Sequence, residues 1–176
     1  MNKYLRIIIW LLFIIGGIAL SIYMDKYVFH LPRLEKGFVY YIIFGFGVIL
    51  FVNILNISGN VGRTLAKHGK TSKDIGRLQT DRLVTTGIYS KMRHPMNQGL
   101  IMLPMAIALI GVSPSFIFFI APIEMLAMYI MIRTIEEAET RRKFGKEYDD
   151  YCAKTPRFCF KWECIKALLK NPDAKR

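Results

Sequence analysis

The sequence has few cysteine, histidine and acidic residues. Its 176 residues include three Cys, three His and 13 Asp or Glu, against 25 Lys or Arg. The spacing of Cys152, Cys159 and Cys164 matches no zinc pattern, and no His lies near them, so we expect no metal site. These three cysteines fall in a tail that we place in the cytoplasm below, and their odd number argues against disulfides. We therefore expect reduced thiols.

Internal repeats, low-complexity tracts and long flexible linkers are also missing, so we expect one domain over residues 1–176. No Gly-rich phosphate loop is present. The chain is 53% hydrophobic, yet its formal net charge is +12, and soluble domains seldom combine these two properties. Because the apolar residues form blocks and the basic residues lie between the blocks, the pattern favours an integral membrane protein over a nucleic-acid binder.

Long runs of the sequence carry no charge. They are Ile7–Met24, Gly37–Gly62 and Pro95–Ile123, and after Glu124 the last run resumes over Met125–Ile132. A bilayer core of ~30 Å needs about 20 helical residues, so the first two runs predict one span each. The third is too long for one helix, and Gly111-Val-Ser-Pro114 interrupts it. The predicted spans cover residues 5–24, 38–61, 96–111 and 115–135.

The fold class expected is therefore an all-α, polytopic membrane protein with about four transmembrane helices, the last two forming a C-terminal helical hairpin. A loop over residues 62–95 and a tail over residues 136–176 lie outside the spans. In the tail, Phe144, Tyr148 and Tyr151 recur at helical spacing and give one face an aromatic character. That face either packs on the membrane surface or covers a site.

Lys and Arg set the predicted orientation. They are concentrated in residues 63–93 and in the tail from Arg133, whereas the turn at Gly111–Pro114 has none. The positive-inside rule then places both termini, the long loop and the tail in the cytoplasm. We expect an integral protein of a bacterial or archaeal cell membrane with a cofactor pocket on the cytoplasmic side.

Charged residues lie at both ends of the last hydrophobic hairpin. Arg93-His94-Pro95 precedes it, and a second cluster from Arg133 to Glu136 and Glu137 follows it. Charge at such a place indicates that a polar, charged molecule binds there. Pro95 suits the first turn of a helix, and the amides that follow it would face a partner at the helix start.

The compound pattern of this region resembles a known family. Residues 83–95 read LVTTGIYSKMRHP, and the hairpin and Glu-Glu pair are followed by Phe144-Gly-x-x-Tyr148-x-x-Tyr151 and Thr155-Pro-Arg-Phe158. This looks like the isoprenylcysteine carboxyl methyltransferase and phospholipid methyltransferase group of integral membrane enzymes, which use S-adenosylmethionine. The resemblance implies that the residues that bind this cofactor are Tyr89, Arg93, His94, Pro95, Asn97, Gly99, Glu136 and Glu137. Asn97 departs from the aromatic or His common at its position, so stacking on adenine is lost.

The chemistry of S-adenosylmethionine agrees with these clusters. Arg93 and Arg133 can form bidentate pairs with a carboxylate, and Glu136 and Glu137 can accept hydrogen bonds from ribose or ammonium. Alternatively, Arg133 and Glu137 pair with each other, because they are four residues apart on one helix. His94 or a glutamate would be the base if the methyl acceptor is an amine, whereas a carboxylate acceptor needs none.

Glu124 lies inside the last span, where a carboxyl group is costly unless it is paired or neutral. It either lines a substrate cavity or forms a hydrogen bond with Asn53 or Asn56. We therefore expect His94, Arg133 and Glu124 to be catalytic in methyl transfer to a lipophilic acceptor, such as a prenylcysteine-like carboxylate or a phospholipid amine. Two alternatives remain: an NADPH-dependent membrane reductase, and a small transporter or assembly factor that uses Glu124. The sequence leaves the acceptor and the oligomeric state open.

Overall fold

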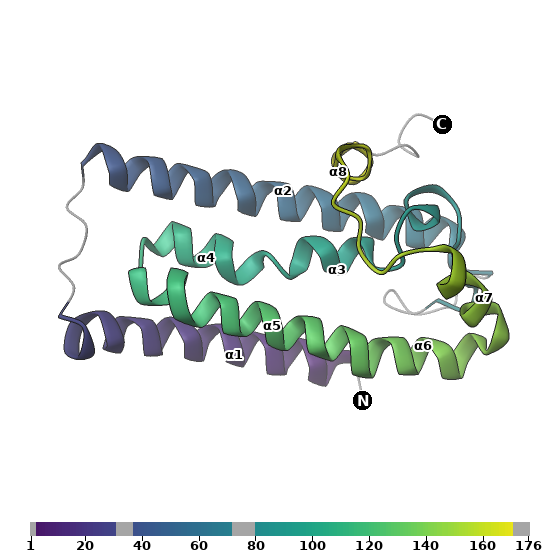
Figure 1. Cartoon of the computed structure of the whole chain (residues 1–176), viewed down its shortest axis with the longest axis horizontal. Coiled ribbons are helices and arrows are strands. Elements are labelled where there is room, and N and C mark those ends of the chain that lie inside the picture. Colours follow the sequence, from purple (N-terminus) through teal and green to yellow (C-terminus); the bar gives the residue numbers. More distant parts are fainter. Residues whose placement is uncertain (1–2, 31–36, 72–79, 171–176) are drawn as a thin grey trace. The chain divides into compact units, whose positions relative to one another are not determined.

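The computed structural model describes residues 3–30, 37–71 and 80–170, and these residues form helices without any strand. The chain divides into two compact units, one of residues 1–52 and 101–130 and the other of residues 53–100 and 131–176. In order along the chain (Figure 1), the elements are α1 Lys3–Tyr23, η1 Met24–Val28, α2 Phe38–His68, η2 Gly87–Ser90, α3 Pro95–Leu100, α4 Leu103–Gly111, η3 Phe116–Ile120, α5 Ala121–Met131, η4 Ile132–Glu136, α6 Glu137–Phe144, α7 Lys146–Lys154 and α8 Trp162–Leu169.

The prediction of a polytopic helical membrane protein is confirmed. Three described helical segments, Leu5–Val28, Phe38–His68 and Phe116–Phe144, are long and apolar enough to cross a bilayer, and Pro95–Gly111 is a shorter apolar segment. α2 continues to His68, beyond the predicted end at residue 61, so the predicted loop begins later. Residues 72–79 of that loop lie outside the described residues. The orientation of the spans stays a prediction.

The apolar segment Pro95–Gly111 is two short helices rather than the single helix predicted for residues 96–111. α3 ends at Leu100 and α4 begins at Leu103, with Pro104 in the first turn of α4. Proline lacks an N–H, and its ring clashes with the carbonyl group four residues earlier, here that of Leu100. The sequence predicted an interruption of the helix only at Gly111–Pro114. That turn is confirmed, because α4 ends at Gly111 and Val112 adopts a left-handed conformation with φ 46°.

The first unit is held together by small residues. Ala106, Ala108 and Ala121 are completely buried, and Phe116 and Ile120 pack with Ala108 and Ala121. α1 lies along η3 and α5, as Figure 1 shows. Helices in membranes associate mainly through close packing, which small side chains permit. The outer faces of α1 and α2 keep large apolar side chains exposed, as lipid-facing surfaces do.

Asp25 ties the first span to the turn of the hairpin. Its Oδ2 accepts a hydrogen bond of 2.5 Å from the Ser113 hydroxyl, and its Oδ1 accepts one of 3.0 Å from the Ser115 backbone N–H. The Ser113 hydroxyl oxygen in turn accepts a 3.3 Å bond from the N–H of Phe116. Asp25 and Ser113 thereby satisfy the backbone N–H groups of Ser115 and Phe116 at the start of a helix, as capping residues do.

Replacing Asp25 with Ala should destabilise the protein by about 1–3 kcal/mol, because the Ser115 N–H and the Ser113 hydroxyl lose their acceptor. The change is measured as a lower midpoint of thermal unfolding in detergent. Lys26→Ala is the control, because Lys26 is exposed next to it and its Nζ lies over the Tyr27 ring, 4.8 Å from the centre. Equal thermal midpoints for the two variants would show that the hydrogen bonds of Asp25 do not stabilise the protein.

The second unit has a separate core beneath α8. Val61 of α2, Val84, Ile88 and Met92 are buried there together with Tyr89, Cys159, Cys164 and Leu168. The predicted tail helix is interrupted: Gly145 has φ 54°, which separates α6 from α7. Glycine adopts positive φ without steric cost, so it supplies the bend. The bend places α7 against the segment that carries Arg93 and His94.

Candidate active site

The site is built on the turn between η2 and α3. Tyr89 lies in η2 and is buried, and Met92 is completely buried. These two side chains pack the turn against the apolar core of the second unit. Pro95 is the first residue of α3, as predicted, and is also buried. Arg93 and His94 therefore project from a rigid turn at the start of a helix.

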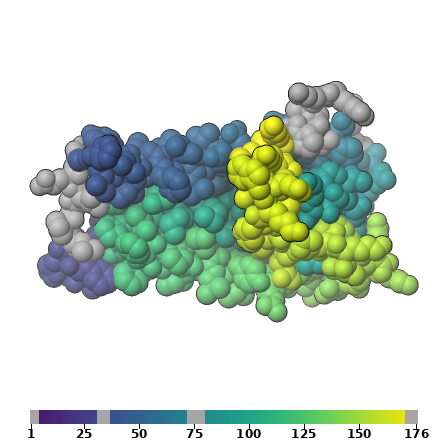
Figure 2. Space-filling model, turned by 45° about the horizontal axis from the view of Figure 1, so that its top comes forward, coloured from purple at the N-terminus to yellow at the C-terminus, as the bar shows by residue number. Residues whose placement is uncertain are grey.

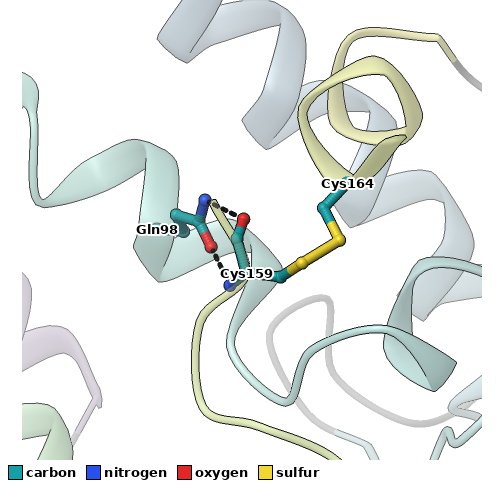
Figure 3. Close-up of a disulfide and its surroundings, with 3 residues drawn as sticks. All are labelled: Gln98, Cys159 and Cys164. Carbon is teal, nitrogen blue, oxygen red and sulfur yellow. Dashed lines mark hydrogen bonds between the residues drawn. A yellow bond between two sulfur atoms is a disulfide. The ribbon is translucent and has the colours of Figure 1, made fainter. Parts of the chain in front are cut away.

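A short extended segment, which we term the strap and define as Thr155–Cys159, runs along this turn. The Arg93 N–H donates a 2.9 Å bond to the Pro156 carbonyl, and the His94 N–H donates a 3.2 Å bond to the Arg157 carbonyl. The Gln98 side chain holds the end of the strap: its Nε2 donates to the Cys159 carbonyl at 2.8 Å, and its Oε1 accepts from the Cys159 N–H at 2.9 Å (Figure 3). The strap is thus bound at both ends of the turn.

Glu137 is the centre of the charged cluster. Its carboxylate accepts from Arg93 Nη2 at 2.9 Å, and it accepts from Arg157 through Nε at 2.9 Å and through Nη2 at 2.7 Å. The side chains of Arg93 and Glu137 are 10% and 9% exposed. Bidentate, charge-assisted pairs of this kind are the strongest hydrogen bonds in proteins, and burial makes the loss of one partner costly.

His94 and Asn97 extend the cluster to Glu136. The His94 Nε2 lies 3.4 Å from Glu137 Oε1, and its Nδ1 lies 3.9 Å from Glu136 Oε2. The Asn97 amide donates to Glu136 Oε2. The two charged clusters that the sequence places at opposite ends of the hairpin therefore meet in space.

Of the predicted aromatic face, Tyr148 and Tyr151 lie on α7, whereas Phe144 ends α6 before the bend. The Tyr151 hydroxyl donates to the carbonyls of Tyr89 and Met92, the latter at 3.4 Å. Burial raises the pKa of the Tyr151 and Tyr89 phenols well above the ordinary value, so both stay protonated. Tyr148 is also buried, and burial raises the pKa of its phenol. The aromatic residues cover the Arg93 turn from the side of α7.

Arg133 is not part of this cluster. It is exposed on η4, and among the described residues the arginines paired with Glu137 are Arg93 and Arg157. The expected pairing of Arg133 with Glu137 assumed a regular α-helix, but residues 132–136 form a π turn. A π turn bonds residues five apart, so it rotates Glu137 out of line with Arg133.

Two other expected site residues pack against neighbouring helices. Gly99 is buried in α3, where an added Cβ would meet the Ile57 side chain of α2 at 3.1 Å, so α3 packs closely on α2 there. Its contact with the cofactor stays a prediction. Glu124 is buried in α5 of the first unit beside Gly17 of α1. Its carboxyl oxygens have no hydrogen-bond partner within the described ranges. The bond to Asn53 or Asn56 stays a prediction.

Sequence reasoning missed Arg157 and Gln98. Arg157 stood within the Thr155–Phe158 part of the family pattern, but no local signal distinguished it from the other basic residues of the tail. The expectation of three reduced thiols is wrong for two of them: Cys159 and Cys164 form a disulfide (Figure 3) with their Cα atoms 5.9 Å apart. Cys152 is free. The bend between the strap and α8 brings these two thiols together, and residue spacing alone does not reveal it.

The fold and the charged cluster together define a polytopic helical membrane protein with a built polar site at the start of a short helix. A family model for phospholipid methyltransferase matches residues 40–147. The chain belongs to this family of membrane methyltransferases. Neither the curated proteins nor the solved structures contain a match. The matched residues include Arg93, His94, Glu136 and Glu137, whereas the strap and α8 lie beyond them.

Proposed function

We propose that the cluster around Glu137 binds S-adenosylmethionine and that the protein transfers a methyl group from it to a lipophilic acceptor in the membrane. The observation that carries this proposal is the convergence of Arg93, His94 and Arg157 on the buried Glu137 carboxylate. Family membership supports the reaction type. The acceptor we propose is a phospholipid amine or a prenylcysteine-like carboxylate.

The residues of the cluster fit this cofactor. S-adenosylmethionine carries a carboxylate, an ammonium, ribose hydroxyls and a sulfonium, so it needs both cations and anions around it. Arg93 and Arg157 are the cations, and Glu136 and Glu137 are the anions. The Nε of Arg93 is buried without a hydrogen-bond partner among the described residues, so this donor remains for a ligand.

The chain's own residues bind, orient and exclude water. When bound, S-adenosylmethionine supplies a methyl group that its positive sulfur already activates. Arg93 and Arg157 would hold the cofactor carboxylate, Glu136 would accept from its hydroxyls, and Tyr151 and Tyr148 would keep water from the turn. Such positioning supplies several kcal/mol of the barrier reduction in bimolecular reactions. Arg157 takes the place that Arg133 has in the sequence interpretation.

Isothermal titration of the purified full chain in detergent tests the cofactor. We expect S-adenosylhomocysteine to bind and NADPH to give no heat. Binding of NADPH without any response to S-adenosylhomocysteine would replace the methyltransferase with the reductase. Heat from neither ligand would contradict both and leave the transporter or assembly factor.

The acceptor is tested by adding phosphatidylethanolamine or a farnesylated cysteine with labelled S-adenosylmethionine and measuring transfer into the lipid phase. An amine must lose a proton before it attacks, so its methylation rate should rise with pH. A carboxylate is ionised from about pH 5 upward and should give a flat profile. The His94 nitrogens both face glutamates, so His94→Gln should lower the rate most for the amine.

Glu124→Gln should leave the affinity for S-adenosylhomocysteine unchanged and alter acceptor turnover several-fold. The reason is that Glu124 is a buried carboxyl within an apolar span, where a polar group that lacks a partner usually has a function. Glu147→Gln, an exposed carboxyl of α7, is the control. Unchanged turnover with every acceptor would show that Glu124 serves packing against Gly17 only.

A further inference from the structure

α8 is a short helix with two different faces, and it lies beyond the residues that the family model matches. Its inner face is firmly attached: Cys164 and Leu168 are buried in the core of the second unit, and Cys164 is bonded to Cys159 of the strap. Its outer face is the part that the proposed methyl transfer does not use.

The outer face of α8 and the residues that flank the helix expose large apolar and basic side chains, together with the acidic Glu163. Phe160 and Trp162 are 76% and 66% exposed, and Leu169 is 40% exposed. Lys161, Lys166 and Lys170 are exposed beside them, and the Lys166 Nζ lies 5.3 Å from the centre of the Trp162 ring. Figure 2 shows α8, in yellow, on the surface of the molecule. Aromatic, aliphatic and Lys side chains on one exposed face are typical of helices that lie in a membrane interface.

The contact between α8 and α2 sets the depth of α8. The Asn60 Nδ2 of α2 donates to the carbonyls of Leu168 and Leu169 at 3.3 and 3.1 Å. Asn60 is near the end of the charge-free run of α2, and Arg63 is the first charge after it. Figure 1 shows α8 end-on while α2 runs along the view, so α8 lies crosswise to this end of α2. With α2 crossing the bilayer, this contact would hold α8 at the edge of the hydrocarbon, with its axis along the membrane plane.

We propose that α8 is an interfacial anchor whose occupant is the anionic phospholipid surface of the bilayer. Phe160, Trp162 and Leu169 insert at the boundary between head groups and acyl chains. Lys161, Lys166 and Lys170 face the phosphates. Charge complementarity favours this occupant over a second copy of the chain, because that copy is itself strongly basic, with net charge +12.

Quenching of tryptophan fluorescence measures the depth of α8 in the bilayer. The chain has two tryptophans, so Trp10→Phe leaves Trp162 alone. The full chain is reconstituted in phosphatidylcholine vesicles containing phosphatidylglycerol, with bromine at carbons 6,7 or at carbons 11,12 of the acyl chains. We expect shallow bromines to quench Trp162 about two-fold more than deep ones, as an interfacial depth of about 5–10 Å requires. Subtracting the Trp162→Phe signal from the wild-type signal gives the same quantity without altering Trp10.

Charge is tested in the same vesicles by omitting phosphatidylglycerol. Quenching by the shallow bromines should fall for the wild type and stay constant for the triple variant Lys161→Gln, Lys166→Gln, Lys170→Gln. The control is Lys146→Gln with Lys154→Gln, which should retain the wild-type dependence, because both side chains are exposed on α7 rather than on α8. Trp162 quenched by aqueous acrylamide but not by bromines would overturn the proposal. Protection from both quenchers, together with a dimer by size exclusion, would overturn it in favour of a second copy.

Discussion

Glu137→Gln is expected to abolish measurable binding of S-adenosylhomocysteine, with an affinity loss of at least about 100-fold. The carboxylate accepts three hydrogen bonds from Arg93 and Arg157, and an amide can replace only part of them. Its NH₂ group would face a guanidinium, which has no acceptor. Two buried or half-buried cations would then be left with too few partners, and the strap would lose its ion pair with α6. Isothermal titration in detergent measures the affinity directly.

Control variants and thermal midpoints distinguish a loss of cofactor binding from a loss of folding. Glu147→Gln removes an exposed carboxylate from the neighbouring helix α7 and should keep full affinity. Arg157→Lys keeps the positive charge but not the bidentate geometry, and we expect an intermediate loss. The thermal midpoint of each variant is recorded in the same detergent. A folded Glu137→Gln protein with wild-type affinity would contradict the proposed site at its centre.

Gly47→Ala is expected to have the largest effect on stability in the first unit. A Cβ at Gly47 would meet the backbone N of Ile110 at 2.7 Å and the backbone C of Leu109 at 2.9 Å. Backbone atoms cannot move aside as the end of a side chain can, so α2 and α4 would have to separate. Overpacking of this kind costs about 1–3 kcal/mol, and close approach of backbones is the main source of association between membrane helices. The midpoint of thermal unfolding should fall accordingly.

Gly45→Ala provides the matched control for this prediction. Gly45 lies in the same helix two residues away, and an added Cβ there meets nothing within 4 Å. Both substitutions also raise helix propensity by the same amount, so the difference between them isolates the contact with α4. Equal midpoints would mean that the first unit does not depend on close packing at Gly47.

The spans were predictable from sequence because charge is excluded from the hydrocarbon, and charge-free runs are visible without any structure. The hairpin turn was predictable for a similar reason, since Gly111 and Pro114 stand within an otherwise apolar run. The break between α3 and α4 was accessible in principle from Pro104, but a proline in a membrane helix does not always end it. The bend at Gly145 follows from a single glycine among strong helix formers, and such a glycine usually continues the helix.

The kinds of residue that form the candidate site were predictable from the sequence, but not every residue that belongs to it was. Arg93, His94, Asn97, Glu136 and Glu137 come together as the family pattern indicates. Spacing on a regular helix allowed Arg133 to pair with Glu137, whereas the described arginine partners of Glu137 are Arg93 and Arg157 of the strap. The role of Arg133 toward the cofactor stays a prediction. The disulfide was missed because it depends on the path of the chain between the strap and α8. Contacts between residues that only the tertiary structure brings together cannot be recognised from a local sequence pattern.

The π turn of η4 has a consequence for how this chain tolerates changes in length. An α-helix advances by about 100° per residue, and the π turn absorbs one residue more than a regular turn would hold. Deleting a single residue from Ile132–Glu136 would therefore restore a regular helix and carry the carboxylate of Glu137 away from both arginines. Insertions and deletions within Ile132–Glu136 would therefore disturb the protein far more than substitutions. A chain without the extra residue would need its glutamate at another position to reach the two arginines.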